Sequence, residues 1–136
     1  MPGHIFDIPS RATPGSGGYD LQSRIAVLLY PGQKLAIPTG WAICLHERMV
    51  GMVTPRSGLA IKNGITVLNS PGIIDSDYRG EIIVILINHG DSDHQIHIGD
   101  RIAQLVIVPV YVPTWVETKD LTETERGDGG FGSTGR

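Results

Sequence analysis

Cysteine is almost absent from this sequence, which has a single one, Cys44, among 136 residues. One cysteine cannot form a disulfide within one chain, so the sequence excludes the small secreted folds that disulfides hold together. Cys44 lies in an apolar run, residues 41–45. We therefore expect a small buried hydrophobic side chain at this position rather than a catalytic nucleophile.

Long apolar runs and an excess of positive charge are missing too. The longest apolar run, residues 82–87, is too short to cross a bilayer, and the first residues lack the charged start and apolar stretch of a secretory signal. The formal net charge is −3, so no broad basic surface is available to nucleic acid. We expect no membrane partner, no stable nucleic-acid binding and a reducing, cytoplasmic setting.

Metal-binding motifs are scarce as well. His94 and His97 form an isolated HxxH pair, and no cysteine or second histidine pair lies at ligand spacing from them. Structural zinc sites combine cysteine and histidine ligands in closely spaced pairs. The sequence therefore gives no support to a structural zinc site.

Glycine and proline, in contrast, are frequent, with 18 and 9 residues, and they separate short β-branched runs. This pattern predicts an all-β fold, a jelly-roll-like β-sandwich or barrel. Helical periodicity is weak, and only residues 57–61, after Pro55, favour a short helical turn. The runs that we predict as strands are residues 25–30, 34–37, 41–45, 49–54, 64–68, 81–88, 95–98 and 101–112.

The chain length fits one domain. We place the β domain at residues 1–112, a polar linker at 113–125 and a C-terminal lid at 126–136. The runs 81–87 and 101–112 are too apolar for strands that face water on one side. A homo-oligomer that buries the surplus apolar surface explains them best.

The last segment, residues 126–136, is a flexible, glycine-rich tail with two arginines, one aromatic ring and adjacent hydroxyls. These groups can bind a base and a polyphosphate. Phosphate loops of the Rossmann and Walker types need a strand before the glycines and a helix after them, so both are excluded here. We interpret the tail as a lid that orders on a nucleotide, because Phe131 and Arg126 favour this over the alternative of a frayed terminus.

Four internal segments place polar residues beside glycines in apolar surroundings: residues 18–21, 55–60, 69–80 and 99–105. With the tail they resemble, in order and spacing, the five signature blocks of the trimeric dUTP diphosphatases, the dUTPases, from about Gly17 to Gly135. The resemblance implies the dUTPase β-clip fold and a homotrimer. It also implies hydrolysis of dUTP to dUMP and pyrophosphate, with Mg²⁺, by attack of water on the α-phosphorus. That reaction keeps uracil out of DNA and supplies dUMP for thymidylate synthesis.

The resemblance assigns the chemistry to Asp75, which would activate the attacking water. Tyr78 would exclude a 2′-hydroxyl, and the hairpin with Asn69, Gly72 and Ile74 would bind the uracil and the sugar. On residue chemistry alone, the turn around Asp75 could equally be a hairpin whose side chains bond the local backbone.

The phosphates would be bound by Arg56, Ser57, Gly58 and Gln104, and Asp20 would hold Mg²⁺ through water. In the tail, Phe131 would stack on uracil, Arg126 would pair with the terminal phosphate, and Gly132, Ser133 and Thr134 would complete the phosphate contacts. Without the resemblance, Ser57 could be a helix N-cap, Arg56 an ion-pair partner and Asp20 a turn residue.

In the family, each site is built from three subunits, so the resemblance implies shared sites and an inactive monomer. Two alternatives stay open. A dCTP deaminase shares the fold but needs deaminating residues, and a non-catalytic nucleotide-binding or regulatory protein could use the same trimer. The intact tail and Asn69 favour hydrolysis over deamination, and Asp75 favours an enzyme over a sensor.

Overall fold

The computed structural model describes residues 7–132 and residue 135. Nine strands and one short helix lie between residues 18 and 109 of this part of the chain. The elements are β1 (Gly18–Gln22), β2 (Val27–Leu29), β3 (Lys34–Pro38), β4 (Met49–Thr54), α1 (Ser57–Asn63), β5 (Ile65–Val67), β6 (Gly72–Ile74), β7 (Ile83–Asn88), β8 (His94–Ile96) and β9 (Arg101–Pro109). The predicted all-β fold and the single helical turn after Pro55 are confirmed.

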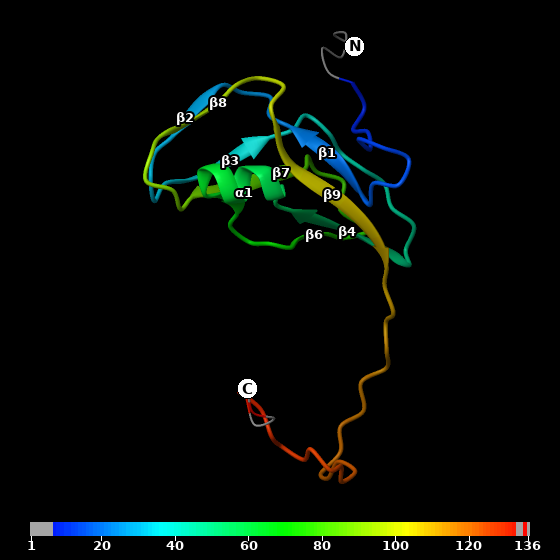
Figure 1. The fold of residues 1–136 in the computed structure, drawn as a ribbon. Coiled ribbons are helices and arrows are strands. Elements are labelled where there is room, and N and C mark those ends of the chain that lie inside the picture. Colours follow the sequence, from blue (N-terminus) through cyan, green and yellow to red (C-terminus); the bar gives the residue numbers. More distant parts are fainter. Residues whose placement is uncertain (1–6, 133–134, 136) are drawn as a thin grey trace.

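The strands form three antiparallel sheets (Figure 1). One sheet has the order β1-β9-β4-β6, a second has the order β3-β7-β5, and β2 pairs with β8. Burial alternates along the longer strands, as in β4 and β7, so one face of each strand points into the core. The core joins Leu21, Val53 and Leu105 of the first sheet to Ile37 and Leu86 of the second. The two sheets therefore form the expected jelly-roll-like sandwich.

The predicted strand at residues 41–45 is wrong, because this stretch has no regular secondary structure. Here the backbone bonds to single partners instead of a ladder: the Trp41 amide donates to Thr39 Oγ1, and the Trp41 carbonyl accepts from the Ile82 amide at 2.7 Å. Gly40, at φ 75°, turns the chain just before this stretch. The expectation that Cys44 is buried is also wrong, since its side chain is exposed in the protomer.

Other differences concern strand ends and two short strands. Strand β9 ends at Pro109 instead of residue 112, and β7 begins at Ile83 instead of residue 81. Strands β1 and β6 were not predicted as strands, because their residues belong to the glycine-containing blocks that we assigned to ligand binding. Both pair with neighbours of the four-stranded sheet and so place binding motifs on a rigid support.

Beyond β9 the chain leaves the sandwich and extends away from it (Figure 1). Val110 still donates to the Arg48 carbonyl at 2.8 Å, and the described residues after Val110 make hydrogen bonds only within their own segment. The segment nevertheless exposes large apolar side chains, with Tyr111 88% exposed and Trp115 92% exposed.

The only described helix has seven residues, and no described helix has the length and apolar character needed to cross a membrane.

Candidate active site

A polar cavity of about 320 Å³ lies where β1, β9 and the start of α1 meet. All five residues that the sequence assigns to the phosphates of the β domain and to the metal line it: Asp20, Arg56, Ser57, Gly58 and Gln104. They come from three segments that are distant in the sequence. The sheet therefore gathers the predicted phosphate and metal residues in one place, which we call the phosphate cavity.

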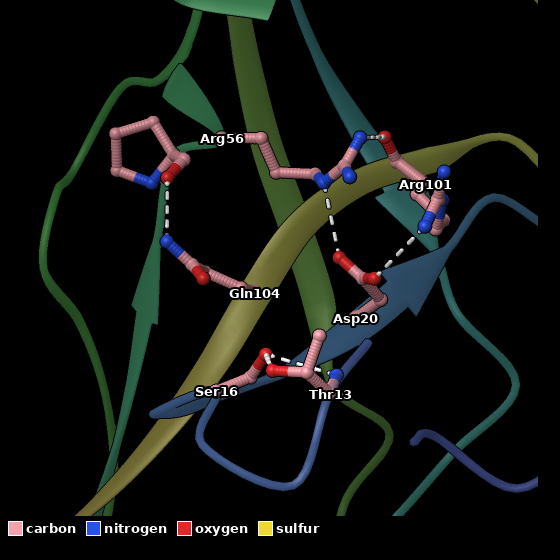
Figure 2. Close-up of polar contacts among 7 residues, drawn as sticks. Thr13, Ser16, Asp20, Arg56, Arg101 and Gln104 are labelled. Atoms are coloured by element: carbon pink, nitrogen blue, oxygen red, sulfur yellow. Dashed lines mark hydrogen bonds and ion pairs between the residues drawn. The ribbon is translucent and has the colours of Figure 1, made fainter. Parts of the chain in front are cut away.

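Strand register explains how these residues meet. Strand β9 lies between β1 and β4, and Gln104 of β9 is opposite Asp20 on one side and Thr54 on the other. Residues directly opposite in an antiparallel pair project to the same face of the sheet. Gln104 Nε2 donates to the Pro55 carbonyl at 3.1 Å, just where β4 gives way to α1 (Figure 2).

The Asp20 carboxylate lies between two guanidinium groups (Figure 2). Arg56 Nε donates to Asp20 Oδ1 at 3.0 Å, and Arg101 Nη1 donates to Oδ2 at 3.4 Å. Arg56 Nη1 also donates to the Arg101 carbonyl at 3.3 Å. The side chain of Asp20 is only 18% exposed, so solvent screens these pairs less than it screens pairs at the open surface. The three side chains thus form one electrostatic unit, in which Asp20 and Arg56 line the phosphate cavity and Arg101 lies outside its lining.

Arg101 had no predicted role. The only sequence signal was its place in the polar block of residues 99–105, and its side chain, 53% exposed, did not require a partner. The alternative for Arg56, an ion-pair partner, is confirmed by its pair with Asp20. The alternative for Asp20, a turn residue, is wrong, because Asp20 lies inside β1.

Ser57 is the first residue of α1, and the N-cap is Arg56, with φ −94° and ψ 128°. No side chain caps this helix end, so the reading of Ser57 as an N-cap is wrong. Ser57 and Gly58 are both exposed at the cavity. The Ser57 hydroxyl is consequently available to a ligand.

A second cavity, of about 200 Å³, lies beside β6 and the turn that follows it. Its walls include every predicted base and sugar residue of the β domain and the predicted catalytic carboxylate: Asn69, Gly72, Ile74, Asp75 and Tyr78. The remaining wall is largely aliphatic, with Val53, Val67, Ile73, Ile83 and Ile85. We call it the base cavity.

Short strand β6 sets the shape of the base cavity. Gly72 and Ile74 are buried in it, and Asp75 is exposed immediately after its end. A Cβ on Gly72 would lie 3.3 Å from Asn69 Nδ2 and 3.4 Å from Val53 Cβ, so a side chain there would crowd the amide. Glycine therefore allows the Asn69 side chain to lie against the strand.

A tight turn follows Asp75, closed by the Tyr78 amide donating to the Asp75 carbonyl at 3.1 Å. Arg79 Nη1 braces the turn by donating to the carbonyls of Ser76 at 2.7 Å and Tyr78 at 2.9 Å. The Tyr78 hydroxyl donates to the Glu81 carbonyl at 3.0 Å, and its ring lies over Gly80, where a Cβ would not fit. The turn thus fixes the backbone of Asp75 relative to the Tyr78 ring.

The phosphate cavity and the base cavity have no lining residue in common. The described tail residues line neither cavity. Arg126 Nε donates to the Gly129 carbonyl at 2.9 Å. Phe131 has a backbone φ of 48°, and its side chain is fully exposed. Gly132 has φ 88°, while Ser133 and Thr134 lie outside the described residues. In one protomer, the predicted residues that the structure describes therefore form three separate groups: the phosphate cavity, the base cavity and the tail.

The phosphate cavity also allows a test of the predicted metal. Within the described residues, no three or more histidine, cysteine, aspartate or glutamate side chains are grouped to hold an ion. Mg²⁺ does not need such a cage, because it keeps several waters and takes one or two carboxylates together with substrate phosphates. Asp20 supplies one carboxylate beside room for water, so these residues fit Mg²⁺ held through water.

Comparison with known proteins identifies the family. The dUTPase family model matches residues 5–135 of the chain. The deoxyuridine 5′-triphosphate nucleotidohydrolase of Brucella melitensis biotype 2 is 50% identical over 134 residues, which is 96% of this chain and 85% of the relative. The protein of the same name from Caulobacter vibrioides strain NA1000 is 49% identical over 134 residues, with 94% and 85% covered.

Solved structures agree. A variant of the Staphylococcus bacteriophage 80alpha dUTPase with dUpNHpp superposes with a TM-score of 0.89 at 29% identity, covering 96% of this chain and 92% of that chain. A variant dUTPase from phage phi11 of S. aureus, described with a structural Mg(II) ion, gives a TM-score of 0.81 at 26% identity, covering 89% and 95%. Sequence and fold thus lead to one conclusion: the chain belongs to the dUTPase family of nucleotide-hydrolysing enzymes.

Proposed function

We propose that the protein is a magnesium-dependent dUTP diphosphatase that releases dUMP and pyrophosphate. The observation that carries the proposal is the base cavity, where a carboxylate, an amide and a tyrosine ring share aliphatic walls. Relatives of 50% identity that are named for dUTP hydrolysis support the substrate. In a cytoplasmic setting, this activity would keep uracil out of DNA and supply dUMP for thymidylate synthesis.

Uracil, a flat ring with a polar edge, would lie between the aliphatic walls of the base cavity. Asn69 and the adjacent main chain present the groups that would read its edge, and buried Gly72 lets them approach closely. Cytosine would present a donor where uracil has an acceptor, and such unpaired groups can cost a factor of ~10⁴ in discrimination. The Tyr78 ring, fixed through Glu81, would meet a ribose 2′-hydroxyl and favour deoxyribose.

Asp75 is the proposed general base. Its carboxylate would accept a proton from a water molecule as the oxygen of that water bonds to the α-phosphorus. The bond from the α-phosphorus to the bridging oxygen breaks, so the β and γ phosphates leave as pyrophosphate and the nucleoside keeps the α-phosphate as dUMP. The braced turn after β6 supports this role because it fixes the backbone that carries Asp75 before substrate arrives.

The phosphate cavity would bind the triphosphate. Ser57 and Gln104 offer neutral donors, Arg56 offers charge, and Gly58 allows a close approach of the backbone. When bound, Mg²⁺ supplies charge neutralisation and orientation of the phosphates. Asp20 would hold the water shell of the ion, and the two arginines would hold Asp20.

The role proposed for Asp20 predicts an altered metal dependence. We expect Asp20→Asn to raise the Mg²⁺ concentration needed for half-maximal activity by about 10- to 100-fold, because outer-shell groups commonly contribute that much to metal affinity. A magnesium titration of the dUTP hydrolysis rate measures this. Asp91→Asn, which changes an exposed carboxylate between β7 and β8, is the control and should leave the titration unchanged. An unaltered titration for Asp20→Asn would remove Asp20 from the metal site.

We further propose that three protomers share each site. The two cavities with no common lining residue support this, since neither contains both the general base and the phosphate ligands. The exposed apolar segment after β9, with Tyr111, Val112, Trp115 and Val116, supports it as well. Such side chains gain free energy by leaving water, at about 25 cal/mol per Å² of apolar surface.

Trp115 tests the oligomer. We expect Trp115→Ser to shift the protein from trimer towards monomer in light scattering on dilution, with a parallel loss of activity, because it removes a large apolar side chain that is 92% exposed in the protomer. Trp115→Phe keeps an aromatic ring and should preserve the trimer. A wild-type monomer that hydrolyses dUTP at its full rate would contradict shared sites.

A direct assay decides between the proposed activity and the other uses of this fold. Incubation with dUTP should release pyrophosphate, and incubation with dCTP should release no ammonia. Ammonia from dCTP would indicate a deaminase. Tight binding of dUTP without any pyrophosphate would indicate a nucleotide sensor.

A further inference from the structure

Gln104 lines the phosphate cavity, and its side chain reaches from β9 to the Pro55 carbonyl. An amide nitrogen has two hydrogens, and the Pro55 carbonyl accepts one of them at 3.1 Å. The second hydrogen is left for a ligand. If the amide turned end over end, Oε1 would face the Pro55 carbonyl with no hydrogen between the two acceptors. Pro55 therefore fixes which end of the amide is the donor.

The other side of the amide lies against Gly18. Gly18 is opposite Val106 in the β1–β9 pair, two residues along from the facing pair Asp20 and Gln104, so a side chain at position 18 would project to the same face as Gln104. A Cβ built on Gly18 would lie 2.7 Å from Gln104 Oε1 and 3.2 Å from both Cβ and Cδ of Gln104. The three atoms nearest to the added carbon thus all belong to Gln104.

The backbone of Gly18 does not itself require glycine, since its φ is not in the left-handed region. The crowded atom at 2.7 Å is the end of a flexible side chain, which can swing away more readily than backbone can. An added methyl group would therefore displace the amide from Pro55 rather than unfold the strand. The requirement for glycine at this position concerns the orientation of Gln104.

We infer that Gly18 is a positioning residue that acts through Gln104: by lacking a side chain, it keeps the Gln104 amide bonded to Pro55 with its second N–H directed to a substrate phosphate. The inference rests on the proposed function, because it assumes that a nucleotide triphosphate occupies the phosphate cavity. Gly18 thus affects one hydrogen-bond donor to the phosphates and no contact with the nucleoside.

The test compares ligands with and without phosphates. We expect Gly18→Ala to raise the Kd of dUpNHpp by about tenfold or more, the usual effect of losing one hydrogen bond to a charged group. Inhibition by deoxyuridine, which lacks phosphates, should not change, because the base cavity contains neither residue. In steady-state assays with dUTP, KM should rise more than kcat falls. A general disturbance of the fold would weaken both ligands.

Two further variants isolate the Gly18–Gln104 contact. Gly15→Ala is the matched control, since a Cβ there meets nothing within 4 Å, and it should bind dUpNHpp as the wild type does. Gln104→Ala should weaken dUpNHpp, and Gly18→Ala should add little in that background, because the displaced amide is already gone. If Gly18→Ala lowers the Tm, the double variant should restore it.

The outcomes are distinguishable. If Gly18→Ala binds dUpNHpp as tightly as Gly15→Ala does, or if the effects of Gly18→Ala and Gln104→Ala are additive, the inference is overturned while the dUTPase assignment stands. If Gln104→Ala binds normally, Gln104 is not the phosphate donor and the inference is again overturned. If the wild-type trimer neither binds dUpNHpp nor hydrolyses dUTP, the proposed function itself fails and the inference fails with it.

Discussion

An Asp75→Asn enzyme should bind dUTP and hydrolyse it at least ~10²-fold more slowly, the usual contribution of a general base. Asparagine has nearly the same size as aspartate and fits the same turn, but its amide cannot take a proton from water. The turn itself is held by backbone and by Arg79, so it should survive the change. Single-turnover rates with dUTP and the Kd of dUpNHpp together measure the effect.

Asp77→Asn is the matched control for this experiment. Asp77 lies in the same turn and is also exposed, but it does not line the base cavity. Its replacement should leave turnover close to that of the wild type. A normal single-turnover rate for Asp75→Asn would assign the proton transfer to another group. A loss of dUpNHpp binding would instead indicate that the carboxylate shapes the base cavity.

Removal of residues 126–136 should abolish most of the activity, by roughly 10²-fold, and leave the Tm unchanged. The loss combines an arginine–phosphate contact with stacking of an aromatic ring on a base, each of which contributes about 1–3 kcal/mol. The Tm should not change because the described residues after Val110 bond only within their own segment and Phe131 buries no surface in the protomer. Activity assays and thermal melts on the truncated protein measure both quantities.

Point variants identify which part of the tail matters. Phe131→Ala and Arg126→Gln in the full-length chain should each reproduce part of the loss, while Lys119→Ala, in the preceding segment, should not. Full activity of the truncated enzyme would show that the tail is not a lid. A lowered Tm would show that the tail stabilises the trimer. The activity loss would then result from a weakened trimer and not from a missing lid.

Local signals predicted most of the strands. Turn residues enclose β-branched runs, and the prediction for residues 49–54 coincides with β4. Residues 41–45 have the same apolar composition, but they form no ladder, and the Trp41 backbone bonds to Thr39 and Ile82 instead. Ile82 is distant in the sequence, and a single long-range bond leaves no local pattern that composition could reveal.

The grouping of site residues was predictable only in part. Residues close in sequence, such as Asn69 and Asp75, do share the base cavity. Strand pairing, not sequence spacing, brings Gln104 opposite Asp20, and the resemblance to a family anticipated their shared role. Neither source anticipated Arg101 on the second oxygen of Asp20, or the fit of Gln104 against Gly18, because both depend on the three-dimensional register of β1 and β9.

The pairing of one carboxylate with two guanidinium groups leaves a single positive charge in excess beside the phosphate cavity, whereas the whole chain carries a net charge of −3. Dissolved ions screen charges over about 10 Å at 0.1 M salt. A polyanion therefore meets weak repulsion from the protein at a distance and attraction only near the cavity mouth. Long-range electrostatic steering should therefore contribute little to its association. Salt concentration should change the dissociation rate constant of the nucleotide more than its association rate constant.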